Sequence, residues 1–363
     1  MNIGSLVPSG KTGYSAAVVD DLATLLTAGR LSSSTRAIVR EAYDNAGSSN
    51  DGLKLAQQLI LTTAEFHSTN PVSSIDQSRD VVSFPPPSNK PYKAVVYLML
   101  SGGVDSYNML APHTCTKVPG KDVYDQYQQV RQQVAIMKQD LRPIDAENQV
   151  CERFGIHPDL PEAERLYNDE SLLFFANTGV LTMPVDKSNY WLLTETQLFA
   201  HNHMQREAKR VDPYNTVSGT GVLGRMADHL SNNGHTVGSF SVDRFSVALV
   251  GKPGISAAPM IVNRNGVPEV YLDLRTEELL PKIHNASASD SGFFAETWSD
   301  QLMSSLGIND VFCDELQGVE TMTEFPTSYL SQQLATVSRL IATREARGVD
   351  TDTFYVETGG EYF

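Results

Sequence analysis

Apolar residues in the first part of the chain recur at the spacing of helices. Within residues 15–67, for example, Val18, Leu22 and Leu25 fall on one face of a helix. Three short helices bury little apolar surface by themselves, so we expect this unit to dock on a larger body. The expected helices are one that ends before Gly29, one that Ser33 or Ser34 caps, and one from about Gly52 to Phe66.

From residue 92 onward, short apolar runs alternate with segments of helical periodicity. This alternation predicts a mainly parallel sheet with helices on both faces. Closely spaced strands and Gly/Pro turns in residues 236–275 favour a local antiparallel insertion. The expected strands are residues 93–100, 171–177, 236–240, 246–250, 259–263 and 353–357, and the expected helices are residues 122–139, 160–168, 195–210, 222–232, 296–306 and 326–346.

A segment rich in Ser, Pro, Asp and Asn separates these two patterns. Within it, the run Pro85–Pro87 is expected to be extended and stiff. The predicted organisation is a helical unit at residues 1–70, a linker at residues 71–91 and an α/β domain at residues 92–363.

The amino-acid composition excludes some classes of binding partner. With 363 residues, 41% of them hydrophobic, the chain can bury a sizeable core. The formal net charge of -15 repels the phosphates of nucleic acids, so we expect no nucleic-acid partner. No apolar stretch is long enough to span a bilayer, and residues 1–5 lack the basic and apolar regions of a signal peptide.

The three cysteines leave two alternatives open. They are too few for a disulfide scaffold, and no Cys-x-x-Cys spacing suggests zinc. A single bridge between Cys115 and Cys151 would form if the protein is secreted. Three free buried thiols, Cys313 included, are the alternative.

The first candidate for chemistry is the turn Ser101–Ser106, which directly follows the apolar run 94–100. Gly102 and Gly103 permit a sharp backbone reversal. The turn would then hold the Asp105 carboxylate at the carboxyl edge of the sheet, where open α/β folds bind ligands. The alternative is that Asp105 only caps a following helix.

A second candidate is the segment His201-Asn202-His203. Two imidazoles so close in sequence can converge at the start of a helix, where they suit zinc, iron or manganese, and Asn202 would orient a substrate oxygen. The alternative is a polar helix start with solvated histidines.

A third candidate is the glycine pattern Gly219–Gly224, which matches a dinucleotide fingerprint, with Asp243 at the distance of a ribose-binding acid. This would make the protein a nucleotide-dependent oxidoreductase. The preceding residues 211–218 contain no apolar run, which favours a flexible glycine loop before a helix instead.

The last residues repeat the pattern of the first turn. An apolar strand is followed by Gly359, Gly360 and then Glu361, so Glu361 would join Asp105 at the same sheet edge.

Taken together, these segments resemble the "domain of unknown function 1501" family of the alkaline phosphatase and sulfatase superfamily. Residues 15–67 are similar to the C-terminal end of the "domain of unknown function 1800" family, on the segments Leu25–Ser32 and Leu61–Phe66. The segments that carry the first resemblance are Leu100–Asn108, Phe154–Leu160, Phe175–Val180, Gln197–Asn202, Gly221–Asp228 and the stretch from Gln332 to Gly360.

The resemblance implies a three-layer α/β/α sandwich and a metal-dependent hydrolase of phosphoric or sulfuric esters, with a small molecule or a glycan as the esterified group. It also implies an extracellular or periplasmic location. Asp105 would supply the first carboxylate to a divalent ion (Zn, Mg, Mn or Ca), and Ser106 would be a fallback nucleophile. The further metal ligands would be His201, His203 and Glu361, and the substrate contacts would be Gly102, Gly103, Asn108, His157 and Asn202.

Three positions depart from the family pattern. Ala200 stands where the family has a serine, His203 stands where it often has an acid, and Glu361 follows the terminal glycines in place of Asp-Thr-His. Two hypotheses therefore remain: an active ester hydrolase, or a non-catalytic binding or structural module, cell-surface or secreted, that needs no metal.

Overall fold

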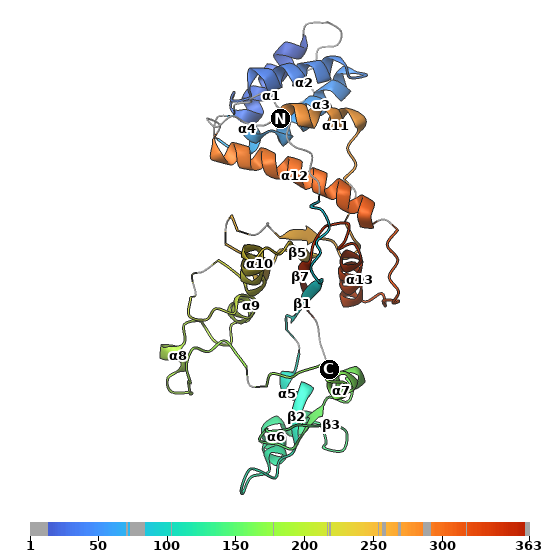
Figure 1. The fold of residues 1–363 in the computed structure, drawn as a ribbon. Coiled ribbons are helices and arrows are strands. Elements are labelled where there is room, and N and C mark those ends of the chain that lie inside the picture. Colours follow the sequence, from blue (N-terminus) through green and yellow to red (C-terminus); the bar gives the residue numbers. More distant parts are fainter. Residues whose placement is uncertain are drawn as a thin grey trace. The chain divides into compact units, whose positions relative to one another are not determined.

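The computed structural model describes residues 14–69, 72, 84–102, 104–176, 178–215, 217, 219–252, 254–255, 259–267, 270–285, 292–316 and 318–359. The chain divides into two compact units, one built from residues 1–87, 265–320 and 342–348 and the other from residues 88–264, 321–341 and 349–363. The first is helical and the second is a mixed α/β unit (Figure 1). Among the described helices, none combines the length and the apolar run that a bilayer-spanning segment requires.

The helical unit combines the N-terminal helices with helices from much later in the sequence. Gly29 has a φ of +77° just after the first helix, as expected for the residue that ends it. The second helix is capped by Ser32, whose hydroxyl accepts a hydrogen bond from the Thr35 amide at 3.1 Å, and not by Ser33 or Ser34. The elements are α1 (Tyr14–Thr27), α2 (Ser33–Asp44), α3 (Ser49–Thr62), α4 (Ala64–His67), α11 (Leu274–Ile283) and α12 (Phe293–Leu316).

One apolar cluster joins α1, α2 and α3 to α11. Val19, Val39 and Leu59 are fully buried in it, and Leu279 of α11 packs against them. The indole of Trp298 on α12 donates to the Thr62 carbonyl at 2.8 Å. The helical unit therefore includes segments that the sequence pattern assigned to the α/β domain.

A four-stranded parallel sheet, in the strand order β1-β7-β5-β6, lies at the centre of the α/β unit. Every residue of β7 is buried, because β1 and β5 pair with it on both sides. The predicted α/β class with a parallel sheet is thus confirmed. The strands are β1 (Lys93–Leu100), β5 (Val237–Val242), β6 (Met260–Val262) and β7 (Thr351–Thr358).

Helices lie on both sides of this sheet. Figure 1 shows α9 (His201–Arg210) and α10 (Val222–Asn232) on one side and α13 (Tyr329–Ala342) on the other. The short 3-10 helix η3 (Val247–Leu249) packs with α10, and Leu223, Leu249 and Tyr355 share one buried cluster.

A small antiparallel sheet, in the order β2-β4-β3, forms a second part of the α/β unit. The Cys115–Cys151 disulfide ties the end of β2 to the residues before β4, so the bridge that the sequence left open is present, and Cys313 is free and buried. The elements of this region are α5 (Ser106–Met109), β2 (Leu110–Thr114), α6 (Val123–Arg131), η2 (Gln132–Val134), β3 (Arg142–Asp145), β4 (Arg153–Ile156) and α7 (Pro161–Asn168). The next helix along the chain is α8 (Tyr190–Leu193).

Several expected elements are wrong. The described part of residues 171–177 contains no strand, and residues 246–250 form η3 because the Ser246 hydroxyl caps a helical turn. The antiparallel insertion in residues 236–275 is also wrong, since β5 pairs with β6 in parallel. Two expected helices are shorter than predicted: in residues 122–139, α6 ends at Arg131, and in residues 195–210, α9 begins only at His201.

Candidate functional site

The turn after β1 is anchored to the end of β7. The Ser101 amide and hydroxyl both donate to the Thr358 carbonyl, at 2.9 and 3.1 Å. Gly102 follows with a φ of +117°, a conformation that favours glycine. The turn therefore starts at the carboxyl edge of the parallel sheet, as the sequence predicted, while Gly103 lies outside the described residues.

Asp105 forms an ion pair with the guanidinium of Arg131, the last residue of α6. It stands directly before α5, but its carboxylate makes no capping hydrogen bond there. Arg131 also lies over the Tyr107 ring, 5.8 Å from the ring centroid. The carboxylate that the family resemblance assigns to a metal is thus already balanced by a cation of the chain itself.

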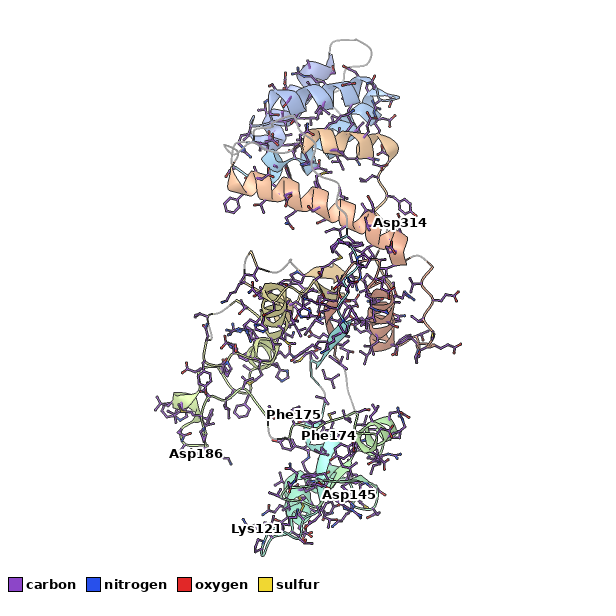
Figure 2. The ribbon with its side chains drawn as sticks, in the orientation of Figure 1. Lys121, Asp145, Phe174, Phe175, Asp186 and Asp314 are labelled. Atoms are coloured by element: carbon purple, nitrogen blue, oxygen red, sulfur yellow. A yellow bond between two sulfur atoms is a disulfide. The ribbon has the colours of Figure 1, made fainter. Side chains whose placement is uncertain are left out.

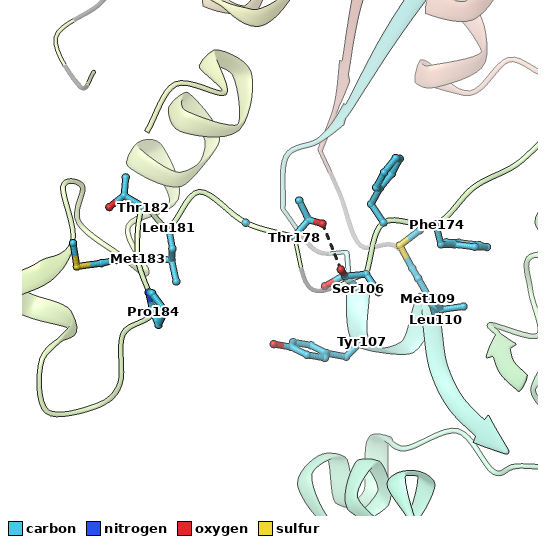
Figure 3. Close-up of a pocket in the computed structure, with 13 residues that line it drawn as sticks. Ser106, Tyr107, Met109, Leu110, Phe174, Thr178, Leu181, Thr182, Met183 and Pro184 are labelled. Atoms are coloured by element: carbon cyan, nitrogen blue, oxygen red, sulfur yellow. Dashed lines mark hydrogen bonds between the residues drawn. The ribbon is translucent and has the colours of Figure 1, made fainter. Parts of the chain in front are cut away.

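Ser106 lies at the start of α5 and lines an open pocket of about 1090 Å³. Figure 3 shows Ser106, Tyr107 and Met109 on one side of the pocket and Leu181, Met183 and Pro184 on the other. Phe174 and Phe175 also line the pocket, and Figure 3 shows Phe174 on the same side as Ser106 and Met109. Figure 2 labels both phenylalanines beside the small antiparallel sheet. Most of the lining is apolar, and hydroxyl groups come from Ser106, Tyr107, Thr178 and Thr182.

Two aromatic side chains of this pocket are largely open to solvent. Tyr107 is 72% exposed and Phe175 is 80% exposed. Large apolar side chains at a concave site commonly mark a surface that binds a ligand. The sequence placed Phe175 in a strand and did not single it out for binding.

Asn108 and His157 both make internal hydrogen bonds close to the pocket without lining it. The buried Asn108 amide donates to the Val134 carbonyl at 2.9 Å, and its oxygen accepts from the Tyr127 hydroxyl at 2.7 Å. His157 Nδ1 accepts the Asp159 amide at 3.2 Å, and the His157 amide donates to the Met109 carbonyl at 3.2 Å. These residues hold α5 and α6 in place around Ser106.

His201, Asn202 and His203 form the first turn of α9. His201 and Asn202 are exposed and His203 is half-buried. Within the described part of the chain, no three His, Cys, Asp or Glu side chains come close enough together to hold a metal ion. Glu361, the fourth expected ligand, lies outside the described residues. The described donors are therefore not gathered at one place, and the divalent metal site stays a prediction.

A cluster that sequence reasoning missed lies at the end of β7. The Glu357 carboxylate accepts from Lys209 Nζ at 2.9 Å and from the Tyr355 hydroxyl at 2.5 Å. Burial raises the pKa of Glu357, but the Tyr355 hydroxyl and the Lys209 ammonium outweigh burial and hold this pKa below its ordinary value. Burial, together with the adjacent carboxylate, raises the pKa of Tyr355 well above its usual range.

The same cluster connects α9 to the turn after β1. The Gln205 side-chain amide donates to the Ser101 carbonyl at 3.2 Å, one turn of α9 before Lys209. The signal in the sequence was the Glu357 carboxylate, which directly follows the apolar run 354–356. It stands two residues before Gly359, and the two glycines drew attention to Glu361 instead.

The glycine pattern at residues 219–224 serves helix packing. A Cβ on Gly221 would lie 1.9 Å from the Val247 carbonyl oxygen, and a Cβ on Gly224 would lie 2.1 Å from the Val250 carbonyl carbon. These two glycines let α10 approach η3 and the residue after it. As the sequence indicated, the described residues between α9 and α10 form no strand that would support a nucleotide site.

Comparison of the chain with family models, with curated proteins and with solved structures gives no significant match.

Proposed function

We propose that this chain is a ligand-binding module with an alkaline phosphatase-like α/β architecture, and that it binds a small molecule with an aromatic or apolar body beside Ser106. The pocket lined by α5 and residues 174–184 carries this proposal. Its exposed aromatic side chains would leave water when such a molecule binds, which is the main favourable contribution to binding of this kind.

The side chains that line the pocket can adapt to the shape of an apolar ligand. Met109 and Met183 have flexible thioether side chains that adjust to the shape of a bound molecule. The hydroxyls of Ser106 and Thr182 offer a few polar contacts that would orient it. The Arg131 guanidinium above Tyr107 stiffens one wall of the pocket.

The Asp105–Arg131 ion pair favours a binding function over metal-dependent hydrolysis. A carboxylate whose charge is balanced by a guanidinium is a weaker ligand for a divalent ion. We therefore regard the chain as a module that keeps the proposed sandwich of the alkaline phosphatase and sulfatase superfamily and uses it for binding. The Cys115–Cys151 disulfide supports a place in an oxidising compartment, outside the cell or in the periplasm.

Ester hydrolysis is the second candidate, and the place of Ser106 favours it. Ser106 is the first residue of α5 and lines the pocket. It belongs to the turn that follows β1 at the carboxyl edge of the sheet. A phosphate or sulfate ester with an aryl group would place its aromatic part against Tyr107 and Phe175.

A neutral fluorescent aromatic probe, N-phenylnaphthylamine, tests the binding proposal on the full chain. We expect saturable binding that the substitution Phe175→Ala weakens about tenfold, the effect of losing one aromatic wall. Leu173→Ala is the matched control, because Leu173 is also largely exposed, lies on the same segment and does not line the pocket. Absence of saturable binding, or an equal loss in both variants, would contradict the proposal.

Assays with 4-nitrophenyl phosphate and sulfate, in the presence of Zn, Mg, Mn or Ca, separate the two candidates. We expect no turnover, and no change of melting temperature when a chelator is added. Turnover that requires an added metal and disappears in Ser106→Ala would establish the hydrolase instead.

A further inference from the structure

The outer edge of β1 is the long unpaired edge of the parallel sheet. β7 pairs with one side of β1 along all eight residues, and no described strand pairs with the other side. At the opposite end of the sheet, β6 is only three residues long, and short edge strands resist unwanted pairing. Residues 94–100 of β1 include no charged residue and no proline, so the strand lacks these two protections of a sheet edge.

The side chains of β1 are also unusually exposed to solvent for apolar residues. Val96 is 40% exposed and Leu98 is 42% exposed, both on the same face of the strand. Val95 on the other face is exposed as well. A strand that is apolar on both faces is typical of the interior of a parallel sheet, where neighbours cover it on each side.

The backbone shows which groups point to this open edge. The amides of Lys93 and Ser101 donate to carbonyls of Asp350 and Thr358, so residues with odd numbers point their backbone groups towards β7. Successive residues of a strand point to opposite edges. Ala94, Val96, Leu98 and Leu100 therefore point their amides and carbonyls outward.

We propose that this edge pairs with the same edge of a second copy of the chain, antiparallel and around a two-fold axis at Tyr97. In this register Ala94 lies opposite Leu100 of the other copy, and Val96 lies opposite Leu98. Each pair brings together two residues whose backbone groups point outward, so every outward amide and carbonyl of β1 finds a partner. The two four-stranded sheets become one continuous sheet.

The outer edge of β1 is complementary to itself, which favours a second copy of the chain as its partner. A two-fold pairing places the same face of both sheets on the same side, so it can only pair residues of equal parity, and the proposed register does so. All four opposed residues are apolar, and the one charge of the strand, on Lys93, falls opposite Ser101 and meets no like charge.

Sedimentation of the full chain tests the pairing. We expect a mass of two chains at micromolar concentrations, against 39.8 kDa for one. Val96→Lys and, separately, Leu98→Glu should each give a single-chain mass with an unchanged circular dichroism spectrum. Ile261→Lys, on the exposed face of β6, is the matched control and should remain a dimer.

Mixing the two variants tests the register. Because residue 96 of one copy faces residue 98 of the other, a mixture of Val96→Lys and Leu98→Glu chains should recover the two-chain mass. A single-chain mass for the unaltered protein at every concentration would overturn the proposal. So would a dimer that survives both single substitutions, or a mixture that stays monomeric.

Discussion

The ammonium group of Lys209 on α9 lies 2.9 Å from the carboxylate of Glu357, the residue before the last of β7. Their side chains are only 16% and 8% exposed, and Lys209 also lies over the Tyr355 ring at 5.5 Å. This ion pair joins the helix that carries His201 to the strand that anchors the turn after β1.

Breaking this pair should be costly. Glu357→Gln leaves the Lys209 ammonium buried without its counter-charge, and we expect the free energy of unfolding to fall by about 3 kcal/mol. Urea unfolding of each variant measures the loss. The double variant Glu357→Gln/Lys209→Met should lose less than the two single losses added together. Simple additivity would show that the two charges do not interact.

Acid should destabilise the α/β unit through two carboxylates. Burial raises the pKa of Asp350, but His235, the Thr236 amide and Ser88 outweigh it and hold this pKa below its ordinary value of 3.8. Glu357 is likewise held below its ordinary value of 4.5. A carboxyl group with a depressed pKa in the folded state stabilises fully above its unfolded pKa, and this contribution is lost as the pH falls through the folded pKa.

We therefore expect stability to decline below about pH 4.5, with less decline in Glu357→Gln and in Asp350→Asn than in the unaltered chain. Thermal unfolding recorded over a series of pH values provides the comparison. A variant that declines as steeply as the unaltered chain would show that its carboxylate is not responsible.

Adding a methyl group at the glycines of α10 should disturb its packing. Gly221→Ala and Gly224→Ala would place a Cβ against the backbone of residues 247–250, and we expect each to lower the free energy of unfolding by about 1–3 kcal/mol. Gly219→Ala is the matched control, since no atom lies within 4 Å of the position of its Cβ. Calorimetric titration with NAD should show no binding to any of these proteins. Saturable binding of NAD would restore the nucleotide hypothesis.

The disulfide should stabilise the small antiparallel sheet. It links residues 36 apart in sequence, and Cys115→Ala/Cys151→Ala should lower the free energy of unfolding by about 2–4 kcal/mol. A reducing agent should destabilise the unaltered protein by a similar amount and leave the double variant unchanged. If the reducing agent destabilised both proteins equally, its effect would not come from the Cys115–Cys151 disulfide.

The two long parallel strands could be predicted because each contains a continuous apolar run that ends near turn residues. Residues 93–100 and 353–357 were both identified from such runs. Residues 171–177 have a similar run, yet Leu173 and Phe175 face solvent, and composition alone does not show whether a neighbour will cover a segment. β2 and β4 were missed because Pro112, His113 and Arg153 interrupt their apolar character.

The candidate site could be predicted only in part. The turn after β1 follows from a strand and two glycines that are adjacent in sequence. The partner of Asp105 is Arg131, 26 residues later at the end of a helix, and no local pattern relates the two. The same holds for Lys209 and Glu357, which are 148 residues apart. Such pairs depend on how the chain folds back, and that is set by packing.

The close contact of α10 with η3 has a consequence for how proteins of this kind are recognised. Gly219, Gly221 and Gly224 match the sequence pattern of a dinucleotide fingerprint. In a nucleotide site, glycine makes room for a phosphate, whereas here Gly221 and Gly224 make room for the backbone of residues 247–251. In a set of homologous chains, Gly221 and Gly224 should be invariant while Gly219 varies freely. A search by motif would assign a cofactor to all of them, and the variation at the first glycine would reveal the error.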